Sequence, residues 1–439
     1  MLGDWPPFRS LSEIGEADHG KEVAVAGWLE DVRDLGGIAF LILRQREGTL
    51  QVTVKSDQPA EVRALTGVSR ESVVALRGTV QANEKVRNGF EIIPVAYEVL
   101  SEAAKPLPLG VVDKVGAAMD TRLDNRFLDL RKEEVRAVFH LKSHVATALR
   151  EYMTSKGFVE THTPKIISAG AEGGATLFRV DYFEKPAYLA QSPQLYKQIL
   201  MATGLDRVYE VAPAFRAELS DTVRHIAEFL SFDAEMAYIR SQEEVLQVLE
   251  GAVAYTLTFL QDHASAQLVL LNLDLVVPDV PVPRVTYQRA REVLAGEGIE
   301  VPDGEDLDTE AEKALGKAMA RDGHDLFFVV EYPSAIKPFY IMVKDDDPEF
   351  SHSFDLEYRG DEMASGGQRE HRVDRIEARM RRQGLDPGDF EFYLKAFRYG
   401  MPPHGGWGFG LDRFVWKVAG LGNVREAVLF PRDRGRLVP

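Results

Sequence analysis

Two pairs of charged residues in the stretch Arg207–Ala237 have the types and the spacing for chemistry on a charged substrate. Arg216 and Glu218 lie two positions apart, as do Asp233 and Glu235. Side chains two apart on a strand point to the same face, so each pair would share one face. The stretch has β-prone runs on both sides of a short polar loop, which predicts an antiparallel hairpin. Its charged face could form a site, or it could be a solvated sheet face. The other face of the second strand would be apolar, with Phe232, Ala234 and Met236.

A glycine pattern near the C-terminus could hold a flat ring and a phosphate. Gly406, Gly408 and Gly410 are followed by Arg413, which gives GxGxGxxR. Alternate glycines remove side chains from one strand face, and a helix that begins there could place the arginine over a ring or a phosphate. The alternative is a tight strand–helix turn. The pattern is not a Rossmann fingerprint, because Leu411 holds the third glycine position, and there is no P-loop motif.

Further segments carry polar side chains that could complete a site. The hairpin loop holds Arg224 and His225, and a glycine-rich segment holds Glu172. That segment could move over a site or be a plain surface turn. Gln194 and Lys197 lie three residues apart at the start of a predicted helix and project from one side of it. Residues 354–371 read as a strand and a turn that present Asp355, Glu357, Glu362, Ser365 and Arg369.

Residues 21–100 have the pattern of a compact all-β domain. Five β-prone runs separated by short turns suggest an OB-type barrel, a fold that often binds oligonucleotides. Phe40 lies near Arg33 and Arg44 in these runs, and Gln51 follows. An exposed aromatic beside basic and amide groups suits stacking on unpaired bases and recognition of their edges. The alternative is that Phe40 is a core residue.

The rest of the chain indicates a hinge and a second domain. We expect a barrel domain at residues 1–104, a hinge at 105–130 and a catalytic domain at 131–439, with a small insertion around 275–350. A capping box at Thr309–Glu312 predicts a helix inside that insertion. The helix that follows the hinge has an apolar stripe of Val138, Leu141, Val145, Leu149 and Met153.

Length and composition limit the class of protein. A chain of 439 residues suggests two or three domains. A hydrophobic content of 45% and a charged content of 28% are typical of a soluble globular protein. No apolar run reaches the roughly 18 residues of a membrane span, and the N-terminus does not read as a signal peptide. The absence of cysteine excludes disulfides and thiolate metal sites and fits a cytoplasmic enzyme. The net charge of −17 argues against nucleic-acid binding over the whole surface.

Together these segments resemble a class II aminoacyl-tRNA synthetase. Pro164 in THTPKI, the FRAE sequence with a following RH, and GxGxGxxR correspond in order to the three motifs of that class. The class I signatures HIGH and KMSKS are absent. Within the class, RLDNRFLDLR, QSPQLYKQ, SGGQREH, FEFYLKAFRYGMPPHGG and LFPRD are similar to the aspartyl-tRNA synthetases of archaeal type, and the resemblance spans nearly the whole chain.

The resemblance implies a fold and an assembly. The fold is α+β, with a five-stranded OB-fold barrel that binds the anticodon and a catalytic domain built on a six-stranded antiparallel sheet flanked by helices. Members form homodimers through the first motif, here near Pro164. The reaction implied is activation of L-aspartate by ATP and transfer to the 3′ end of tRNA. In-line attack on the α-phosphate needs positioning and charge neutralisation rather than a protein nucleophile.

The resemblance also implies roles for the polar residues around ATP. Arg216 would hold the α-phosphate and the aspartate carboxylate together, and Glu218 would contact adenine. Arg224 and Arg413 would bind the outer phosphates, with His225 nearby. Further ATP contacts would come from Ile226, Gly410, Leu411 and Asp412. Mg²⁺ would be held by Glu362 and Ser365, which offer the hard oxygen donors that this cation prefers.

The amino acid and the anticodon have their own implied sets. The ammonium of aspartate would meet Gln194, Glu172 and Asp233, with Ser365 beside them. Its side-chain carboxylate would meet Lys197 and Arg369, two cations for one anion. The anticodon would contact Arg33, Phe40, Gln51 and Glu91, with Phe40 stacked on the central base.

Three alternatives share parts of the pattern. An asparaginyl-tRNA synthetase would usually lack a basic residue at Lys197, because its substrate is neutral. A non-catalytic RNA-binding paralogue would tend to lose several of the motif residues that are present here. A paralogue that makes asparagine would lack the OB domain.

The sequence also bears on which tRNAs are charged. Members of the family are either strict for tRNA(Asp) or relaxed toward tRNA(Asn), which differs at the third anticodon base. Strict archaeal members tend to carry a large aromatic where this chain has Glu30, and a lysine where it has Arg87. We therefore expect a relaxed enzyme. The alternative is that Glu30 or Arg87 restores discrimination through another contact.

Overall fold

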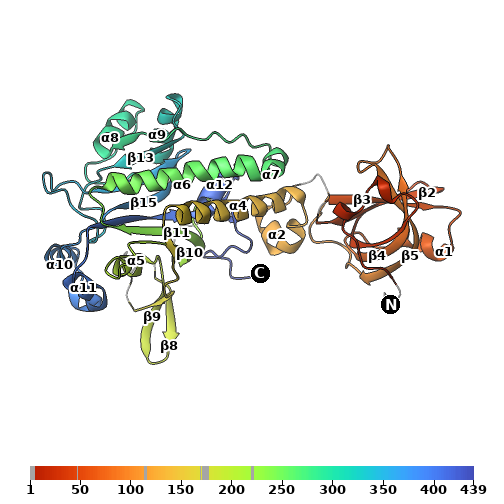
Figure 1. Ribbon diagram of the computed structural model, residues 1–439, viewed down its shortest axis with the longest axis horizontal. Coiled ribbons are helices and arrows are strands. Elements are labelled where there is room, and N and C mark those ends of the chain that lie inside the picture. The colour runs from red at the N-terminus through yellow and green to blue at the C-terminus, as the bar shows by residue number, and fades with distance from the viewer. Residues whose placement is uncertain (1–4, 47, 113–115, 169, 171–176, 219–221) are drawn as a thin grey trace. The chain divides into compact units, whose positions relative to one another are not determined.

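The computed structural model describes residues 5–46, 48–112, 116–168, 170, 177–218 and 222–439 (Figure 1). The chain divides into two compact units, Met1–Lys132 and Glu133–Pro439. Within the described residues, none of the helices combines the length and apolar character needed to cross a membrane.

The first unit is built around a closed five-stranded barrel with the strand order β1-β2-β3-β5-β4. Its strands are β1 (Glu22–Asp34), β2 (Ile38–Gln45), β3 (Gly48–Lys55), β4 (Val73–Ala82) and β5 (Phe90–Ser101), and its helices are α1 (Ala60–Arg63), α2 (Met119–Asp124) and α3 (Arg126–Asp129). Every second residue of β2 and β3 points into the barrel, so Leu41, Leu43, Leu50, Val52 and Val54 are buried. The predicted OB-type barrel is confirmed. The helices α2 and α3 lie within the segment that the sequence marked as a hinge.

The second unit is organised by one large sheet with the strand order β12-β13-β14-β15-β16-β11-β10-β6. Its strands are β6 (Val159–Glu160), β10 (Arg207–Phe215), β11 (Glu228–Ala237), β12 (Arg284–Thr286), β13 (Leu326–Val330), β14 (Ser353–Tyr358), β15 (Asp361–Gln368) and β16 (His404–Gly410). The six strands from β13 to β10 pair antiparallel, whereas β12 and β6 pair parallel at the two edges. The six-stranded antiparallel sheet is therefore present, with one short parallel strand added at each edge.

Helices cover this sheet and build smaller layers at its ends. They are α4 (Glu133–Ser155), α5 (Gln194–Met201), α6 (Gln242–His263), α7 (Ser265–Leu270), α8 (Tyr287–Gly296), α9 (Thr309–Arg321), α10 (Val373–Arg382), α11 (Glu391–Arg398) and α12 (Leu411–Val418). A separate three-stranded sheet consists of β7 (Ile166–Ile167), β9 (Lys185–Leu189) and β8 (Arg179–Tyr182). In Figure 1 the long helices α4 and α6 run side by side along the large sheet.

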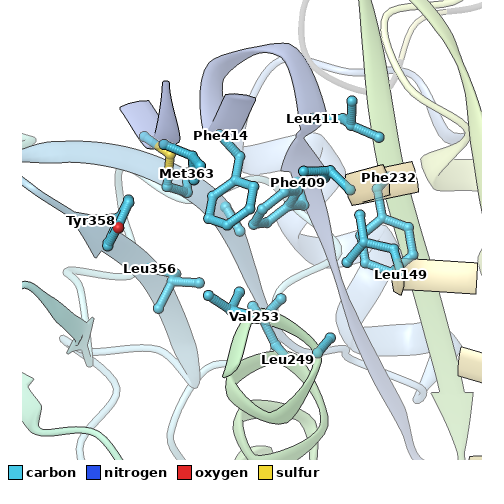
Figure 2. Close-up of a cluster of buried hydrophobic side chains, with 14 of the residues drawn as sticks. Leu149, Phe232, Leu249, Val253, Leu356, Tyr358, Met363, Phe409, Leu411 and Phe414 are labelled. Carbon is cyan, nitrogen blue, oxygen red and sulfur yellow. The ribbon is translucent and has the colours of Figure 1, made fainter. Parts of the chain in front are cut away.

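The main core lies between this sheet and the helices α4, α6 and α12. Figure 2 shows Leu149 of α4 and Leu249 of α6 pointing toward Phe232 and Phe409 of the sheet. The five apolar residues predicted for the α4 stripe are all buried. A fully buried side chain of this size contributes about 1.5–3 kcal/mol. Removing the ring of Phe232 would therefore strip the sheet of one of its main contacts with the helix layer.

The predicted hairpin is present as β10 and β11, and its two faces differ as expected. Phe232, Ala234 and Met236 lie in the core, while Asp233 and Glu235 face the other way. The segment 275–350 is only partly an insertion, because it supplies β12 and β13 to the large sheet while α8 and α9 pack with a core of their own.

Candidate functional site

A cavity of about 360 Å³ opens over β11, β15 and β16. Most of the residues that the sequence marked for the site lie on its wall: Gln194, Arg216, Glu218, Arg224, His225, Ile226, Asp233, Glu362, Ser365, Arg369, Gly410, Asp412 and Arg413. Glu172 lies outside the described residues. Lys197 and Leu411 do not line the cavity.

The order of the strands explains why distant residues meet here. β16 lies between β11 and β15, and Gly408 is the register partner of Asp233 on one side and of Ser365 on the other. A Cβ at Gly408 would lie 3.3 Å from Oδ2 of Asp233. A side chain at this position would therefore fill the space above the strand. The central row of the cavity floor consists of Asp233, Gly408 and Ser365.

Gly406 has a different reason to be glycine. A Cβ at this position would lie 2.0 Å from the carbonyl oxygen of Ala234 and 2.3 Å from Oε2 of Glu235. The position must stay bare so that the buried Glu235 carboxylate can lie against the strand. All three glycines of the pattern were expected to make room for a bound ring, whereas Gly406 is required by packing.

Two buried ion pairs stand beside the cavity floor. Lys197 Nζ lies 2.7 Å from Oδ2 of Asp233, 2.7 Å from the carbonyl oxygen of Trp407 and 3.7 Å from Oε2 of Glu235. Arg369 binds Glu235 through Nε at 2.9 Å and Nη2 at 3.2 Å. Each cation therefore has a carboxylate partner in the protein.

This pairing changes how Lys197 and Arg369, expected as two cations for one substrate carboxylate, can select an amino acid. Two unpaired cations would have penalised a neutral amino acid strongly, but Lys197 and Arg369 are balanced by Asp233 and Glu235. Glu235 was noted in the sequence without a role. Its role is visible only in the structure, because Arg369 lies 134 residues away from it in the chain.

The opposite end of the cavity is rich in cations. Nη1 of Arg413 donates to the carbonyl oxygen of Glu362 at 2.8 Å, and the Arg216 guanidinium lies 5.4 Å from the ring centre of Phe229. Burial lowers the pKa of His225, so its imidazole is neutral at pH 7. Nη1 of Arg224 lies 2.5 Å from Oε2 of Glu312.

Glu312 was not predicted to contact a site residue, and its predicted role in capping α9 is wrong. The sequence predicted a capping box at Thr309–Glu312, but the side chain of Asp308 caps α9 by accepting from the backbone of Glu310 and Ala311. Glu312 reaches back to Arg224 instead. No local signal could have identified this contact, which joins residues 88 positions apart.

Several acids crowd together next to these cations. Burial and the nearby Glu362 raise the pKa of Glu312 to about 7. Burial also raises the pKa of Glu357 and, together with Asp355, that of Glu362. Within the described residues, Oδ1 of Asp355 has no hydrogen-bond partner. The crowding of negative charge means that a cation at this point would stabilise the ionised acids.

These acids fit a hard divalent cation in chemistry. Glu362 and Ser365 both line the cavity, and Asp355 faces Ser365 across the β14–β15 ladder. Carboxylate and hydroxyl oxygens suit Mg²⁺, which also keeps several waters of its own. Three or more His, Asp or Glu side chains do not gather into a complete metal cage anywhere in the part of the chain that the structure describes.

Two residues that the resemblance assigns to ATP also hold the start of α12 in place. Leu411 is fully buried in the main core. The Asp412 carboxylate accepts from the backbone nitrogen of Leu230 at 2.7 Å and pairs with Lys142. These contacts anchor the start of α12. Leu411 faces the core, whereas Asp412 is held by its two partners and also lines the cavity.

The barrel unit brings its four marked residues to one outer face. Arg33 pairs in register with Phe40, and Phe40 pairs with Thr53 on the next strand. Glu91 accepts from Gln51 at 2.8 Å. Phe40 is half-buried and is not part of the barrel core, so the alternative that it is a core residue is wrong.

Glu30 also belongs to a network on the barrel. Arg44 is buried and binds Glu30 at 3.1 Å and Glu71 at 2.6 Å. Arg131 binds the same Glu71 at 2.8 Å, and Arg44 and Arg131 both lie over the ring of Trp28. The carboxylate of Glu30 is thereby directed toward Arg44.

Comparison with known proteins identifies relatives of both units. Residues 118–434 match the family of class II tRNA synthetases for D, K and N, and residues 23–100 match the OB-fold nucleic acid binding domain of the anticodon type. The aspartate–tRNA(Asp) ligase of Pyrococcus furiosus is 51% identical over 431 residues, which cover 98% of each chain. The aspartate–tRNA(Asp/Asn) ligase of Methanopyrus kandleri is 50% identical over 422 residues, which cover 96% of each chain.

A solved structure is similar over the full chain. The asparaginyl-tRNA synthetase of Pyrococcus horikoshii complexed with asparaginyl-adenylate has a TM-score of 0.92 and 32% identity, covering 99% of this chain and 100% of the other. Because that protein is named for asparagine, the fold alone does not distinguish an aspartate enzyme from an asparagine enzyme.

Proposed function

The chain belongs to the class II aminoacyl-tRNA synthetases of the aspartate, lysine and asparagine group, and from this premise we propose how it works as an aspartate–tRNA ligase. It activates L-aspartate with ATP and transfers it to the 3′ end of tRNA. The observation that carries the residue assignments is that the cavity places a balanced set of buried acids and cations at one end and a group of arginines at the other.

The first step joins the two substrates in this cavity. An oxygen of the aspartate α-carboxylate attacks the α-phosphorus of ATP, the bond to the bridging oxygen breaks, and pyrophosphate leaves. In the second step a terminal ribose hydroxyl of tRNA attacks the carbonyl carbon, and AMP leaves. Arg216 lies on the cavity wall and would neutralise the α-phosphate, and Arg224 and Arg413, on the same wall, would bind the outer phosphates.

The amino acid fits the end of the cavity that lies beside the two buried ion pairs, Lys197–Asp233 and Arg369–Glu235. Asp233 and Gln194 present oxygen atoms that suit the ammonium, and Arg369 offers its guanidinium to the side-chain carboxylate. Lys197 acts from beneath the floor by balancing Asp233. The charge of the pocket is thus set by four buried groups together rather than by two free cations.

Mg²⁺ would be held by Glu362 and Ser365, with Asp355 as a further oxygen donor. When bound, the cation supplies charge neutralisation at the triphosphate. The residues of this chain contribute by holding these oxygens on the β14–β15 hairpin, where Arg413 donates to the carbonyl oxygen of Glu362.

The test of the assignment is ATP–pyrophosphate exchange with each amino acid in turn. Aspartate should support exchange and asparagine should not. Exchange driven by asparagine alone would instead identify an asparaginyl enzyme, for which the similar fold already provides a precedent.

The barrel would bind the anticodon, and we infer that the enzyme charges both tRNA(Asp) and tRNA(Asn). The outer face made by Arg33, Phe40, Gln51 and Glu91 offers one aromatic ring among polar groups. Glu30 is held by Arg44, so this position carries a carboxylate instead of a rigid aromatic wall. Relatives of both kinds, for tRNA(Asp) alone and for tRNA(Asp/Asn), are about equally similar to this chain. Charging of each purified transcript with aspartate decides the question.

We also propose a cytoplasmic homodimer. Val159 of the edge strand β6 and Ile166 of β7 are 46% and 50% exposed on either side of Pro164. A second copy of the chain would cover these apolar side chains. Light scattering should give twice the mass of one chain, and a mass equal to one chain would contradict the proposal.

A further inference from the structure

A chain of buried polar contacts leads from a backbone carbonyl to the cavity wall. Nδ1 of His404 lies 2.8 Å from the carbonyl oxygen of Pro402, and Nε2 of the same ring lies 3.0 Å from Nε2 of Gln198. Oε1 of Gln198 lies 2.9 Å from Nε2 of Gln194, whose own Oε1 lies 3.5 Å from Nη2 of Arg369. All four side chains are buried, and the reaction described above uses neither His404 nor Gln198.

Which group donates in each hydrogen bond of this chain follows from the contact between His404 and the carbonyl oxygen of Pro402. A carbonyl oxygen can only accept, so Nδ1 of His404 carries the proton. Burial lowers the pKa of His404 to about 4, so the ring is neutral at pH 7 and its Nε2 has a free lone pair. Gln198 must therefore turn its NH₂ group to the ring and its carbonyl oxygen to Gln194. Gln194 donates to that oxygen and leaves its own oxygen toward Arg369 and the cavity.

A second donor makes this direction hard to reverse. The hydroxyl of Tyr393, on α11, donates to Oε1 of Gln198 at 3.2 Å. Burial raises the pKa of Tyr393 well above its usual value, so the hydroxyl keeps its proton. If the Gln198 amide were reversed, its NH₂ group would face the NH₂ group of Gln194, and its oxygen would face the lone pair of His404. Both contacts would be lost inside the protein, where water cannot replace them.

We propose that His404 and Gln198 are positioning residues that fix the carbonyl oxygen of Gln194 toward the amino-acid end of the cavity. An oxygen at that point attracts an ammonium group and repels a carboxylate. Together with Asp233, it would bind aspartate with its ammonium toward α5 and its side-chain carboxylate toward Arg369. This inference rests on the proposed function, because it assigns that end of the cavity to the amino acid.

The kinetic test separates aspartate binding from ATP binding. Gln198→Met keeps the length of the side chain but removes its three hydrogen bonds, to His404, Gln194 and Tyr393. We expect it to raise the KM for aspartate in the exchange reaction by about tenfold, with changes under about threefold in kcat and in the KM for ATP. Tyr393→Phe is the comparison variant, because it removes only the second donor to Gln198 and keeps the His404 contact that sets the direction. It should change the KM for aspartate by less than about threefold. An unchanged KM for aspartate in a folded Gln198→Met enzyme would overturn the proposal, and so would an equal rise in both KM values.

The two amide replacements of His404 give a rescue test. His404→Gln can place a carbonyl oxygen near the position of Nε2 and should keep more of the affinity for aspartate than His404→Asn, whose side chain is too short to reach Gln198. Equal losses in the two variants would contradict a role that depends on the acceptor.

Nuclear magnetic resonance tests the direction without any catalysis. Among the 10 histidines of the ¹⁵N-histidine-labelled enzyme, the His404 signal is the one that disappears in His404→Gln. We expect the neutral tautomer with the proton on Nδ1 at pH 7.5. The opposite tautomer or a charged ring would reverse the chain and overturn the proposal. Because this measurement needs no substrate, it decides the direction even if the enzyme shows no exchange with aspartate, a result that would contradict the proposed function instead.

Discussion

At the scale of single residues, Glu362 combines a position on the cavity wall with a crowded acidic neighbourhood. Glu362→Gln removes the charge but keeps the shape. Without this carboxylate, Mg²⁺ would bind less well and the charge of the triphosphate would be less neutralised. We therefore expect the exchange rate to fall at least about a hundredfold, or about 2.7 kcal/mol. The matched control is Glu357→Gln, the register partner of Glu362, which does not line the cavity and should lose much less. Full exchange by the wild-type enzyme in excess EDTA would contradict this prediction.

Lys197 tests the buried charge balance. Lys197→Leu leaves Asp233 and Glu235 with one cation, Arg369, in a buried environment. Removing one member of a buried ion pair costs about 3–5 kcal/mol, so the free energy of unfolding should fall by this amount and aspartate activation should be largely lost. Urea unfolding and the exchange assay measure the two effects. A variant with normal stability would show that the two acids are not ionised together.

His404 makes stability depend on pH in a predictable direction. Its folded-state pKa is about 4 against an ordinary value of 6.5, because burial, Arg369 and His371 disfavour the charged ring more than Glu235 favours it. Between pH 6.5 and 4 the unfolded chain binds a proton that the folded chain does not, so stability is lost as the pH falls through this window. His404→Gln should reduce the loss of stability between pH 7.5 and pH 5 by about 2 kcal/mol. Calorimetry at the two pH values would show an equal loss in both proteins if the ring were already charged in the folded state.

Sequence reasoning at this scale succeeded where a local rule decides the outcome. The alternation of strand faces placed Phe232 in the core and Asp233 in the cavity. It failed where a partner is distant in the chain, as for Glu235 with Arg369 and for Glu312 with Arg224. Spacing along the chain says nothing about such pairs, because only the tertiary fold brings them together.

At the scale of elements, the outer face of the barrel should act in only one of the two steps. Phe40→Ala removes the ring that faces outward from β2, and loss of stacking on a base costs about 1–3 kcal/mol. We expect aminoacylation to weaken about fivefold or more while ATP–pyrophosphate exchange stays normal. An equal fall in both rates would mean that the substitution damages the fold.

The elements differ in how far the sequence could predict them. The helix α4 follows from the periodicity of its apolar residues. Just after it, Gly157 has a φ of +77°, a backbone conformation that favours glycine. The strand that precedes Pro164, Val159–Glu160, is only two residues long, which is too short for a recognisable pattern. The segment 275–350 was predicted to be an insertion, yet β12 and β13 complete the sheet edge. A strand of three residues such as β12 carries too short a pattern to be recognised, and only its partner strand stabilises it.

At the scale of the whole molecule, the prediction concerns which tRNAs become charged. The chain carries a net charge of −17, so tRNA must be recognised through local surfaces rather than by overall attraction. With Glu30 directed to Arg44, no rigid aromatic wall stands at this point of the barrel face. We expect tRNA(Asp) and tRNA(Asn) transcripts to be aspartylated with comparable kcat/KM. A preference of about a hundredfold or more for the tRNA(Asp) transcript, or about 2.7 kcal/mol, would establish a strict enzyme.

The glycines of the cavity floor limit how such an enzyme can diverge. A Cβ at Gly366 would lie 2.4 Å from the carbonyl oxygen of Gly406, and one at Gly406 would lie 2.0 Å from that of Ala234. These contacts are with backbone atoms, so no neighbouring rotamer change could make room for a new side chain. Gly366 and Gly406 are therefore fixed by packing, and a change of substrate would have to come from other positions, such as Gln194 and Arg369 on the cavity wall. Related enzymes that activate a different amino acid would therefore be expected to keep these two glycines.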